Sequence, residues 1–310
     1  MDNDKKVSFV IPCYKSSKTI GDVVKEIKDS MAGREYEIVL VNDASPDDTF
    51  EVISKLCKKD HRVVGINLNE NFGQHAALMA GFHHVSGDII VCLDDDGQTP
   101  ACEVDKLLNE MEKGRDAVYA KYQDRKHSSF RNFGSRVNEL MLRFMLNKPK
   151  DLTVSSYFAI NRLIVDEIIK YTNPYPYVIG LVLRSTKNVS NVEINHRERT
   201  CGTSGYTLGK LLTLWMNGFT AFSVKPLRIA TGIGGAMAAV SFAYGIVTII
   251  LKIIGINYVL GFSALMAVMT FIGGLNLLML GIIGEYIGRI YISLNKSPQF
   301  IEKEVIDMRT

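Results

Sequence analysis

Strand-like and helix-like patterns alternate along the first third of the chain. Short runs rich in β-branched residues are typical of strands, and the stretches between them have the spacing of amphipathic helices. The predicted elements are, in chain order, Val7–Ile11, Thr19–Met31, Glu37–Val41, Asp47–Lys58, Val63–Asn67, Gln74–Val85, Ile89–Leu93 and Glu103–Lys113. This alternation predicts an α/β fold with a mostly parallel sheet covered on both faces. Ligands of such folds bind in loops that follow the carboxyl ends of strands.

Two long stretches near the C-terminal end carry almost no charge. Ile229–Leu251 and Val259–Gly284 are each long enough to cross a bilayer, at ~1.5 Å per helical residue against a ~30 Å hydrocarbon core. Neither has the polar face of a surface helix, which favours membrane spans over the alternative of two buried core helices. Basic residues flank this hairpin at Lys225, Arg228, Arg289 and Lys296. The positive-inside rule therefore places both of its ends in the cytoplasm.

The segment Leu208–Phe222, between these two regions, is aromatic and apolar and contains the only tryptophan, Trp215. Its composition suits an interfacial helix lying on the membrane, with a helix packed on the soluble domain as the alternative. The expected domains are a cytoplasmic catalytic domain (1–204), an interfacial amphipathic region (205–228), two transmembrane helices (229–291) and a cytoplasmic C-terminal tail (292–310).

Charge and cysteine content narrow the function classes. A net charge of +3 is too small to indicate a nucleic-acid partner, and no arginine-rich run occurs. The 5 cysteines are scattered without a Cys-x-x-Cys pair, which suggests neither a disulfide framework nor a zinc site. The polar N-terminal residues lead directly into a strand pattern, so we expect no signal peptide. We expect a multi-pass protein of the inner or plasma membrane with both termini in the cytoplasm.

Three adjacent carboxylates, Asp94, Asp95 and Asp96, directly follow the predicted strand that ends at Leu93. Adjacent carboxylates repel each other, so a cation or hydrogen-bond donors must neutralise them. The simplest neutraliser is Mg²⁺ or Mn²⁺, held by one or two carboxylates and by diphosphate oxygens, where it would stabilise a departing nucleoside diphosphate. The alternative is an ordinary solvated loop or helix cap.

Asp43 follows the strand Glu37–Val41 in the same way. Its carboxylate is placed to accept a hydrogen bond from the N–H of a nucleotide base. The alternative is that this segment caps the following helix, with Asp47 the strongest capping candidate.

Four motifs then occur in a fixed order: Val10–Tyr14, Val41–Ser45, Asn71–Phe82 and Leu93–Gln98. Together they resemble the family 2 inverting glycosyltransferases, whose GT-A fold binds nucleotide sugars. Within that family the chain is similar to the polyprenyl-phosphate glycosyltransferases, which include dolichol-phosphate mannose synthase, the GtrB-type glucosyltransferases and the ArnC undecaprenyl-phosphate aminoarabinose transferase. Gly281–Tyr291 is similar to the end of the second span in those proteins, so the resemblance covers nearly the whole chain.

The resemblance implies roles for individual residues. The nucleotide-sugar-binding set is Pro12, Tyr14, Asp43, Asp94, Asp95 and Arg131. The metal ligands are Asp94, Asp96 and Gln98. The acceptor-phosphate set is Ser135, Arg199, Ser204 and Tyr206. Asp94, Asp96 and Arg199 are expected to be catalytic. Arg199 suits an acceptor phosphate because a guanidinium presents a fork of donors matched to phosphate oxygens. A solvated surface arginine is the alternative for Arg199.

The chain departs from the family pattern in three places. Lys15 and Ser16 follow Tyr14 where relatives usually have an acidic residue, so one nucleotide contact is missing or replaced. Glu70 stands where relatives have a basic residue, and Phe158 stands at an arginine position after the segment that begins at Asp151. The sugar and acceptor side is therefore the part of the site least transferable from relatives.

The resemblance implies a metal-dependent hexosyltransferase. It would move a sugar from a nucleotide sugar, expected to be a UDP-hexose or UDP-N-acetylhexosamine, to undecaprenyl phosphate for cell-envelope glycan modification. Its partners would be the donor, the polyprenyl phosphate, the bilayer and copies of itself in a homo-oligomer such as a tetramer. Two alternatives stay open: a catalytically silent scaffold or transport partner that kept the fold, and a synthase that uses another acceptor.

Overall fold

The computed structural model describes residues 5–122, 149, 151–195, 225–254, 262–295 and 297–309. The chain divides into two compact units. Unit 1 contains Met1–Leu211 together with Lys296–Thr310, and unit 2 contains Leu212–Asn295. The chain therefore leaves unit 1, forms unit 2 and then returns to unit 1.

The strands described in unit 1 form one eight-stranded sheet with the order β7-β5-β6-β4-β1-β2-β3-β8. Their bounds are β1 Val7–Cys13, β2 Tyr36–Asn42, β3 Val63–Leu68, β4 Ile89–Cys92, β5 Ala117–Tyr122, β6 Phe158–Asn161, β7 Val189–Ile194 and β8 Glu302–Ile306. The central strands β3, β2, β1 and β4 are parallel, whereas β6 and β8 run antiparallel to their neighbours. The prediction of a mostly parallel α/β sheet is confirmed.

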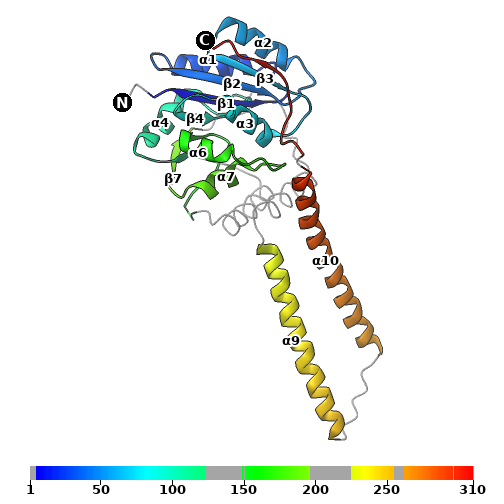
Figure 1. Cartoon of the computed structure of the whole chain (residues 1–310). Helices are drawn as coiled ribbons and strands as arrows, with labels where there is room; N and C mark the ends of the chain where they lie inside the picture. The colour runs from blue at the N-terminus through cyan, green and yellow to red at the C-terminus, as the bar shows by residue number, and fades with distance from the viewer. Residues whose placement is uncertain are drawn as a thin grey trace. The chain divides into compact units, whose positions relative to one another are not determined.

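Helices cover both faces of this sheet (Figure 1). Their bounds are α1 Ile20–Ser30, α2 Thr49–Lys59, α3 Gln74–Phe82, α4 Val104–Glu112, α6 Arg162–Ile168 and α7 Val178–Ser185, with a short 3₁₀ helix, Ala101–Glu103, before α4. Helices α1, α2 and α4 share one apolar cluster with the strands. Helix α1 shows why: its buried residues Ile20, Val23, Val24 and Ile27 have the spacing of one helical face.

Helix α3 packs on the opposite face from α1 and is buried along nearly its whole length. A Cβ atom at Gly81 would lie 2.4 Å from Cγ1 of Val10 on β1. Only glycine permits this close approach of helix to strand. The approach holds the C-terminal end of α3 against β1.

The order in which successive strands are added to the sheet reverses at β1. Strands β2 and β3 follow on one side of β1, and β4 lies on its other side. Loops that follow such neighbouring strands part to opposite faces, which creates a crevice at the carboxyl ends of the strands. The loops after β1, β2 and β4 all reach this edge, and they contain most of the described candidate residues.

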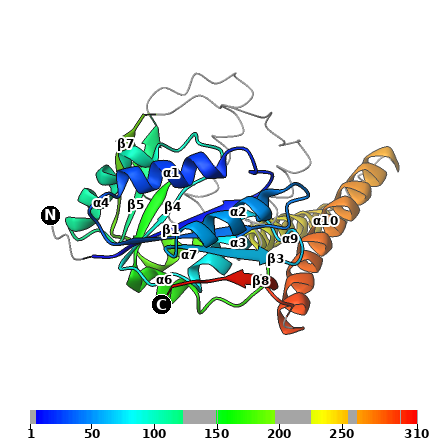
Figure 2. The ribbon, with the colours of Figure 1, turned by 90° about the horizontal axis from the view of Figure 1, so that it is seen from above.

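The last strand, β8, comes after unit 2 and joins the sheet at its β3 edge (Figure 2). It pairs antiparallel with β3, with Ile306 opposite Gly65 and Val305 opposite Ile66. The sequence pattern indicated no element in this stretch. Strands β5 to β7 and helices α6 and α7 were also not predicted from the sequence.

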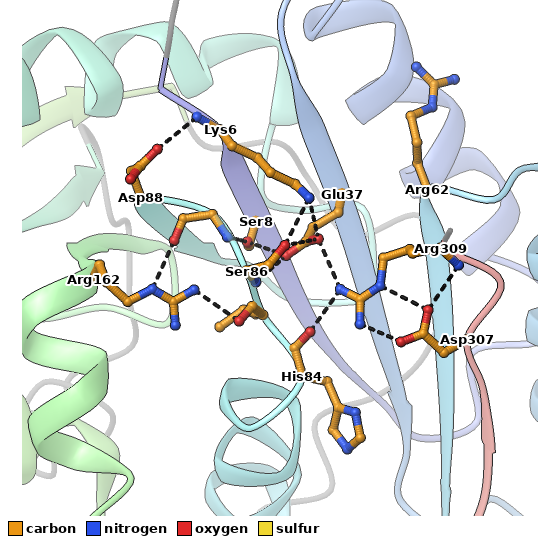
Figure 3. Close-up of polar contacts among 12 residues, drawn as sticks. Lys6, Ser8, Glu37, Arg62, His84, Ser86, Asp88, Arg162, Asp307 and Arg309 are labelled. Carbon is orange, nitrogen blue, oxygen red and sulfur yellow. Dashed lines mark hydrogen bonds and ion pairs between the residues drawn. The ribbon is translucent and has the colours of Figure 1, made fainter.

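The end of the chain is fixed at the amino ends of β1 and β2, around the buried carboxylate of Glu37 (Figure 3). Nη1 of Arg309 and Nζ of Lys6 each lie 2.9 Å from Oε2 of Glu37. The hydroxyl groups of Ser8 and Ser86 donate hydrogen bonds to the same carboxylate at 2.6 and 2.7 Å. This cluster therefore joins Arg309, in the segment that follows β8, to Lys6 and Glu37 at the amino ends of β1 and β2.

Unit 2 contains two long apolar helices, α9 (Lys225–Ile253) and α10 (Phe262–Leu294). Within them Ala230–Leu251 and Phe271–Leu294 have mean hydropathies of 1.9 and 1.5, and neither window is buried within the described chain. Both helices are long and apolar enough to cross a membrane. Helix α10 continues to Leu294, beyond the predicted end at Gly284. Leu208–Phe222 lies outside the described residues.

Candidate active site

The site lies at the carboxyl edge of the sheet, where the loops after β1, β2 and β4 converge. Pro12 is near the end of β1, Asp43 follows β2, and Asp94 lies two residues beyond β4. Pairing of β1 with both β2 and β4 brings these ends together. The predicted gathering of these residues at one edge follows from this strand order.

Asp94 is held through both of its carboxylate oxygens. Nε2 of Gln74 donates to Oδ1 at 3.0 Å, and the hydroxyl group of Ser156 donates to Oδ2. The pKa of Asp94 is raised to about 6, chiefly by burial and also by the nearby carboxylates of Asp96 and Asp95, against the lowering effect of Ser156 and Gln74. The donors are both neutral, so they orient this carboxylate without neutralising its charge.

Asp95 points toward a different loop. Its Oδ2 accepts a hydrogen bond from the backbone N–H of Tyr14 at 2.9 Å and another from the hydroxyl group of Ser16. Burial raises the pKa of Asp95, and these two donors act in the opposite direction. Asp95 therefore joins the loop after β4 to the loop after β1.

Asp96 shapes its own loop. Its Oδ1 accepts a hydrogen bond from the backbone N–H of Gln98 at 3.0 Å, and Gly97 between them has a φ of 73°. This left-handed residue lets the chain turn back over the carboxylate, which is the geometry of an Asx turn. Asp96 and Gln98 are thereby placed on the same short turn.

Asp43 anchors the segment that leads into α3. Its two oxygens accept hydrogen bonds from the backbone N–H groups of Phe72 and Gly73 at 2.8 and 2.9 Å. The side chain of Asn71 donates to the backbone carbonyl of Asp43 at 3.1 Å. Burial raises the pKa of Asp43, and the two backbone donors oppose that rise. Asp43 thus supports α3, and each carboxylate oxygen keeps a lone pair for a ligand.

Tyr14 is the exposed aromatic side chain of this edge, with 47% of its surface accessible. The next residue, Lys15, has a φ of 58°, and Ala44 in the loop after β2 has a φ of 47°. Left-handed conformations are uncommon for residues other than glycine and concentrate at functional sites. The two loops that carry the candidate nucleotide contacts are therefore both strained.

Five predicted site residues, Arg131, Ser135, Arg199, Ser204 and Tyr206, lie outside the described residues. Their roles stay predictions. The sequence analysis in turn missed three polar residues that the structure places in the site. These are Ser16, Gln74 and Ser156, which hold the carboxylates described above. The sequence could have indicated Gln74, because this residue lies in the motif Asn71–Phe82 and begins α3.

The side-chain oxygen atoms at this edge suit a metal ion only together with oxygen atoms from a bound substrate. Among the described residues, no group of three or more His, Cys, Asp or Glu side chains is arranged to hold a metal ion. Mg²⁺, however, is commonly held by one or two carboxylates together with substrate phosphates and water. The predicted ligands Asp94, Asp96 and Gln98 lie on one loop after β4 and would need substrate phosphates and water to complete such a set. Burial, followed by the two acidic neighbours, raises the pKa of Asp94.

Comparison with protein families assigns the chain to a known family. Residues 8–171 match the family described as Glycosyl transferase family 2, and residues 225–290 match the family described as GtrB C-terminal hairpin. The chain belongs to glycosyl transferase family 2. The resemblance inferred from the ordered motifs is therefore confirmed, as are the GT-A α/β fold and the helix hairpin that follows it.

Curated relatives align with both the family 2 region and the hairpin region of this chain. A protein of Salmonella paratyphi B is 32% identical over 308 residues, which cover 97% of this chain and 94% of the relative. A protein of Klebsiella pneumoniae is 31% identical over 307 residues, with the same coverage. Both are named undecaprenyl-phosphate 4-deoxy-4-formamido-L-arabinose transferase.

Solved structures share the fold. Glucosyl-3-phosphoglycerate synthase of Mycobacterium tuberculosis, in complex with UDP, superposes with a TM-score of 0.52 at 18% identity, covering 69% of this chain and 79% of the synthase. A complex of that synthase with Mn²⁺, UDP and phosphoglyceric acid gives a TM-score of 0.52 at 21% identity, covering 68% and 75%. At such identities the likeness shows the fold alone.

Proposed function

We propose that this glycosyltransferase moves a sugar from a nucleotide sugar, with a UDP-sugar as the expected donor, to undecaprenyl phosphate. The observation that carries the proposal is the match of 97% of the chain, catalytic unit and hairpin together, to undecaprenyl-phosphate sugar transferases. The acidic crevice at the sheet edge supplies a donor site, and the helix pair supplies a route to a lipid acceptor. The product is a lipid-linked monosaccharide for cell-envelope glycan modification.

The chain's return to unit 1 supports a membrane arrangement. Unit 1 contains the chain on both sides of the α9–α10 pair. If α9 enters the membrane, α10 must leave it on the same side, because β8 pairs with β3. The crevice and the C-terminal strand then face one compartment. The basic residues that flank the pair favour the cytoplasm.

Donor binding is proposed at the carboxyl edge of the sheet. Tyr14 and Asp43 lie on the two strained loops and would contact the nucleotide. Asp94, Asp96 and Gln98 would hold Mg²⁺ or Mn²⁺, which would stabilise negative charge on the departing diphosphate. Gln74 and Ser156 fix the direction of the Asp94 carboxylate before the donor arrives. Such preorganisation lowers the cost of reaching the transition state.

The proposed reaction is a single inverting displacement. An oxygen of the lipid phosphate forms a bond to the anomeric carbon while the bond from that carbon to the diphosphate oxygen breaks, and the electron pair leaves with the nucleotide. A phosphate is already ionised near pH 7, so the reaction needs no strong general base. Positioning of the acceptor is assigned to Arg199, on the sequence motif alone.

The proposal is tested with purified full-length protein in detergent. It is incubated with undecaprenyl phosphate, Mg²⁺ or Mn²⁺ and single nucleotide sugars, and lipid products are identified by mass spectrometry. The panel contains UDP-glucose, UDP-N-acetylglucosamine, UDP-N-acetylgalactosamine and nucleotide-linked amino- and formamido-arabinose, since relatives are named for the latter sugar. One lipid-linked sugar, lost on chelation of the metal, supports the proposal. No product with any donor from folded protein contradicts it and favours a silent scaffold.

A further inference from the structure

The turn after β1 is held by side chains from three other segments. The backbone N–H of Tyr14 donates to Oδ2 of Asp95 at 2.9 Å, and the N–H of Lys15 donates to Oγ of Ser45 at 3.0 Å. The N–H of Ser16 donates to Oγ1 of Thr49 at 2.9 Å. Three consecutive amides of one turn are therefore bound by the loop after β4, the loop after β2 and the start of α2.

This turn needs external support because of its backbone conformation. Lys15 has a φ of 58°, a left-handed conformation that is unfavourable for a residue with a Cβ atom. Such a conformation persists only where neighbouring groups stabilise it. The Tyr14 ring is about half exposed, and Nζ of Lys15, on the same turn, lies 5.4 Å from its centroid. The position of the ring therefore depends on the backbone of this turn.

Asp95 differs from the two carboxylates beside it in the direction of its hydrogen bonds. One oxygen, Oδ2, accepts from both the Tyr14 N–H and the Ser16 hydroxyl. Asp94 instead binds Gln74 and Ser156, from α3 and the segment before β6. The three adjacent carboxylates therefore hold separate parts of the site. Asp95 is the one that connects the loops after β4 and β1, across the point where the order of strand addition reverses.

We propose that Asp95 is a positioning residue that sets the turn at Tyr14–Ser16 and thereby the Tyr14 ring, and that it neither binds the metal nor contacts the nucleotide directly. Its effect on donor binding rests on the proposed function, whereas its hold on the turn does not. The inference also accounts for one departure from the family pattern. Where relatives carry an acidic residue after the tyrosine, Asp95 brings a carboxylate to this turn from β4.

Two substitutions separate positioning from charge. Because one oxygen accepts both hydrogen bonds, the carbonyl oxygen of Asp95→Asn can keep them without the negative charge. Asp95→Ala removes both. If Asp95 is a positioning residue, Asp95→Asn should preserve the conformation of the turn and UDP binding, and Asp95→Ala should weaken both. If Asp95 is a metal ligand or a charge contact, both variants should lose UDP binding. Ser16→Ala removes only one of the two hydrogen-bond donors to Asp95, so it should weaken the turn and UDP binding less than Asp95→Ala does. Asp48→Ala is the matched control, an exposed carboxylate on the next loop that makes no capping hydrogen bond to α2.

The first measurement is hydrogen–deuterium exchange of the peptide that spans residues 9–20 in the full-length protein. We expect Asp95→Ala to speed exchange of this peptide about tenfold, because it removes both hydrogen bonds that Asp95 accepts from the turn. Asp95→Asn and Asp48→Ala should leave the exchange near the wild-type rate. Unchanged exchange in Asp95→Ala would overturn the inference. This measurement needs no substrate, so it decides the question even if the proposed function fails.

The second measurement is calorimetric titration with UDP and Mn²⁺. We expect Asp95→Ala to weaken UDP binding about tenfold and Asp95→Asn by less than about threefold, with the Mn²⁺ requirement unchanged in both. Loss of binding in Asp95→Asn with the peptide still protected would overturn the inference in favour of a direct charge contact. Absence of UDP binding by the wild-type protein would instead count against the proposed donor.

Discussion

Carboxylates at the two ends of the parallel strands have opposite surroundings. At the amino ends, burial alone would raise the pKa of Glu37, but hydrogen bonds from Ser8, Ser86 and Lys6 lower it to about 2. The cations of Lys6 and Arg309 both lie beside this carboxylate. At the carboxyl ends, Asp94 receives only neutral donors and its pKa is raised to about 6. Figure 3 shows how completely the first carboxylate is surrounded by donors.

This difference separates a structural site from a ligand site. A buried charge whose partners all lie within the chain needs nothing from solution, and removal of one partner destabilises the fold because it leaves the charge uncompensated. A carboxylate with neutral donors and two acidic neighbours leaves a charge for a cation or ligand to compensate. The contrast favours a role in folding for Glu37 and supports the proposed functional role of Asp94. It also fixes which substitutions should affect activity and which should affect stability.

The largest expected effect is on turnover. Asp96→Asn removes one of the proposed metal ligands and keeps the side-chain size, so we expect transfer to the lipid to fall about 100- to 1000-fold, roughly 3–4 kcal/mol of transition-state stabilisation. The measurement is the rate of lipid-linked product formation at saturating donor. Thermal unfolding of the variant should match the wild type, and an unchanged rate would remove Asp96 from the metal site.

The second prediction concerns the opposite end of the strands. Arg309→Ala leaves the buried Glu37 with one cation fewer, so β8 should open more readily by about 2 kcal/mol. Hydrogen–deuterium exchange of Glu302–Ile306 measures this opening, and turnover at saturating substrate should change little. Lys303→Ala, an exposed position within β8, is the control. If Arg309→Ala left the protection of β8 intact, the assignment of Glu37 to folding would be wrong.

The sequence predicted the elements whose signal is local. The alternation that starts at Val7 predicted the central strands and the helices α1 to α4, and the acidic run after Leu93 indicated the edge that holds the site. Both follow from spacing within a few residues. Prediction failed where partners are distant in sequence. Arg309 and Glu37 are 272 positions apart, and a short charged segment such as β8 becomes a strand only because β3 offers an edge.

Site details show the same limit. The motifs predicted a functional role for Asp94. The hydroxyl group that orients its carboxylate comes from Ser156, 62 positions later, in a segment that departs from the family pattern. That departure was interpreted as a loss of transferable information. The structure shows that part of the segment supports the same carboxylate from another direction. Sequence alone could not reveal this, because the contact depends on the antiparallel pairing of β6 with β4.

The third prediction uses the raised pKa of Asp94. A folded pKa of about 6, above the ordinary value near 4, means that ionising Asp94 costs stability that is absent below about pH 4 and complete above about pH 6. Asp94→Asn removes that cost, so without metal it should stabilise unit 1 by about 1–2 kcal/mol at pH 7.5 and by less at pH 4.5. Denaturant unfolding at both pH values measures the difference. Asp48→Asn is the control, and a stabilisation that does not change with pH would contradict this origin.

The smallest expected effect distinguishes two adjacent serines. The Ser156 hydroxyl donates to Asp94, whereas Oγ of Ser155 lies 2.8 and 2.9 Å from the backbone carbonyl oxygens of Ala120 and Tyr157. Ser156→Ala removes a donor that favours the ionised carboxylate, so the pKa of Asp94 should rise and the acidic limb of the pH–rate profile should move to higher pH.

We expect turnover of Ser156→Ala at pH 7 to fall about fivefold, near 1 kcal/mol, and to recover in part as the pH is raised. Ser155→Ala should instead lower thermal stability and leave the shape of the pH–rate profile unchanged, because its hydroxyl group contacts only backbone carbonyls in the described structure. Equal shifts of the acidic limb in both variants would mean that local packing, rather than the hydrogen bond to Asp94, sets the protonation of the site.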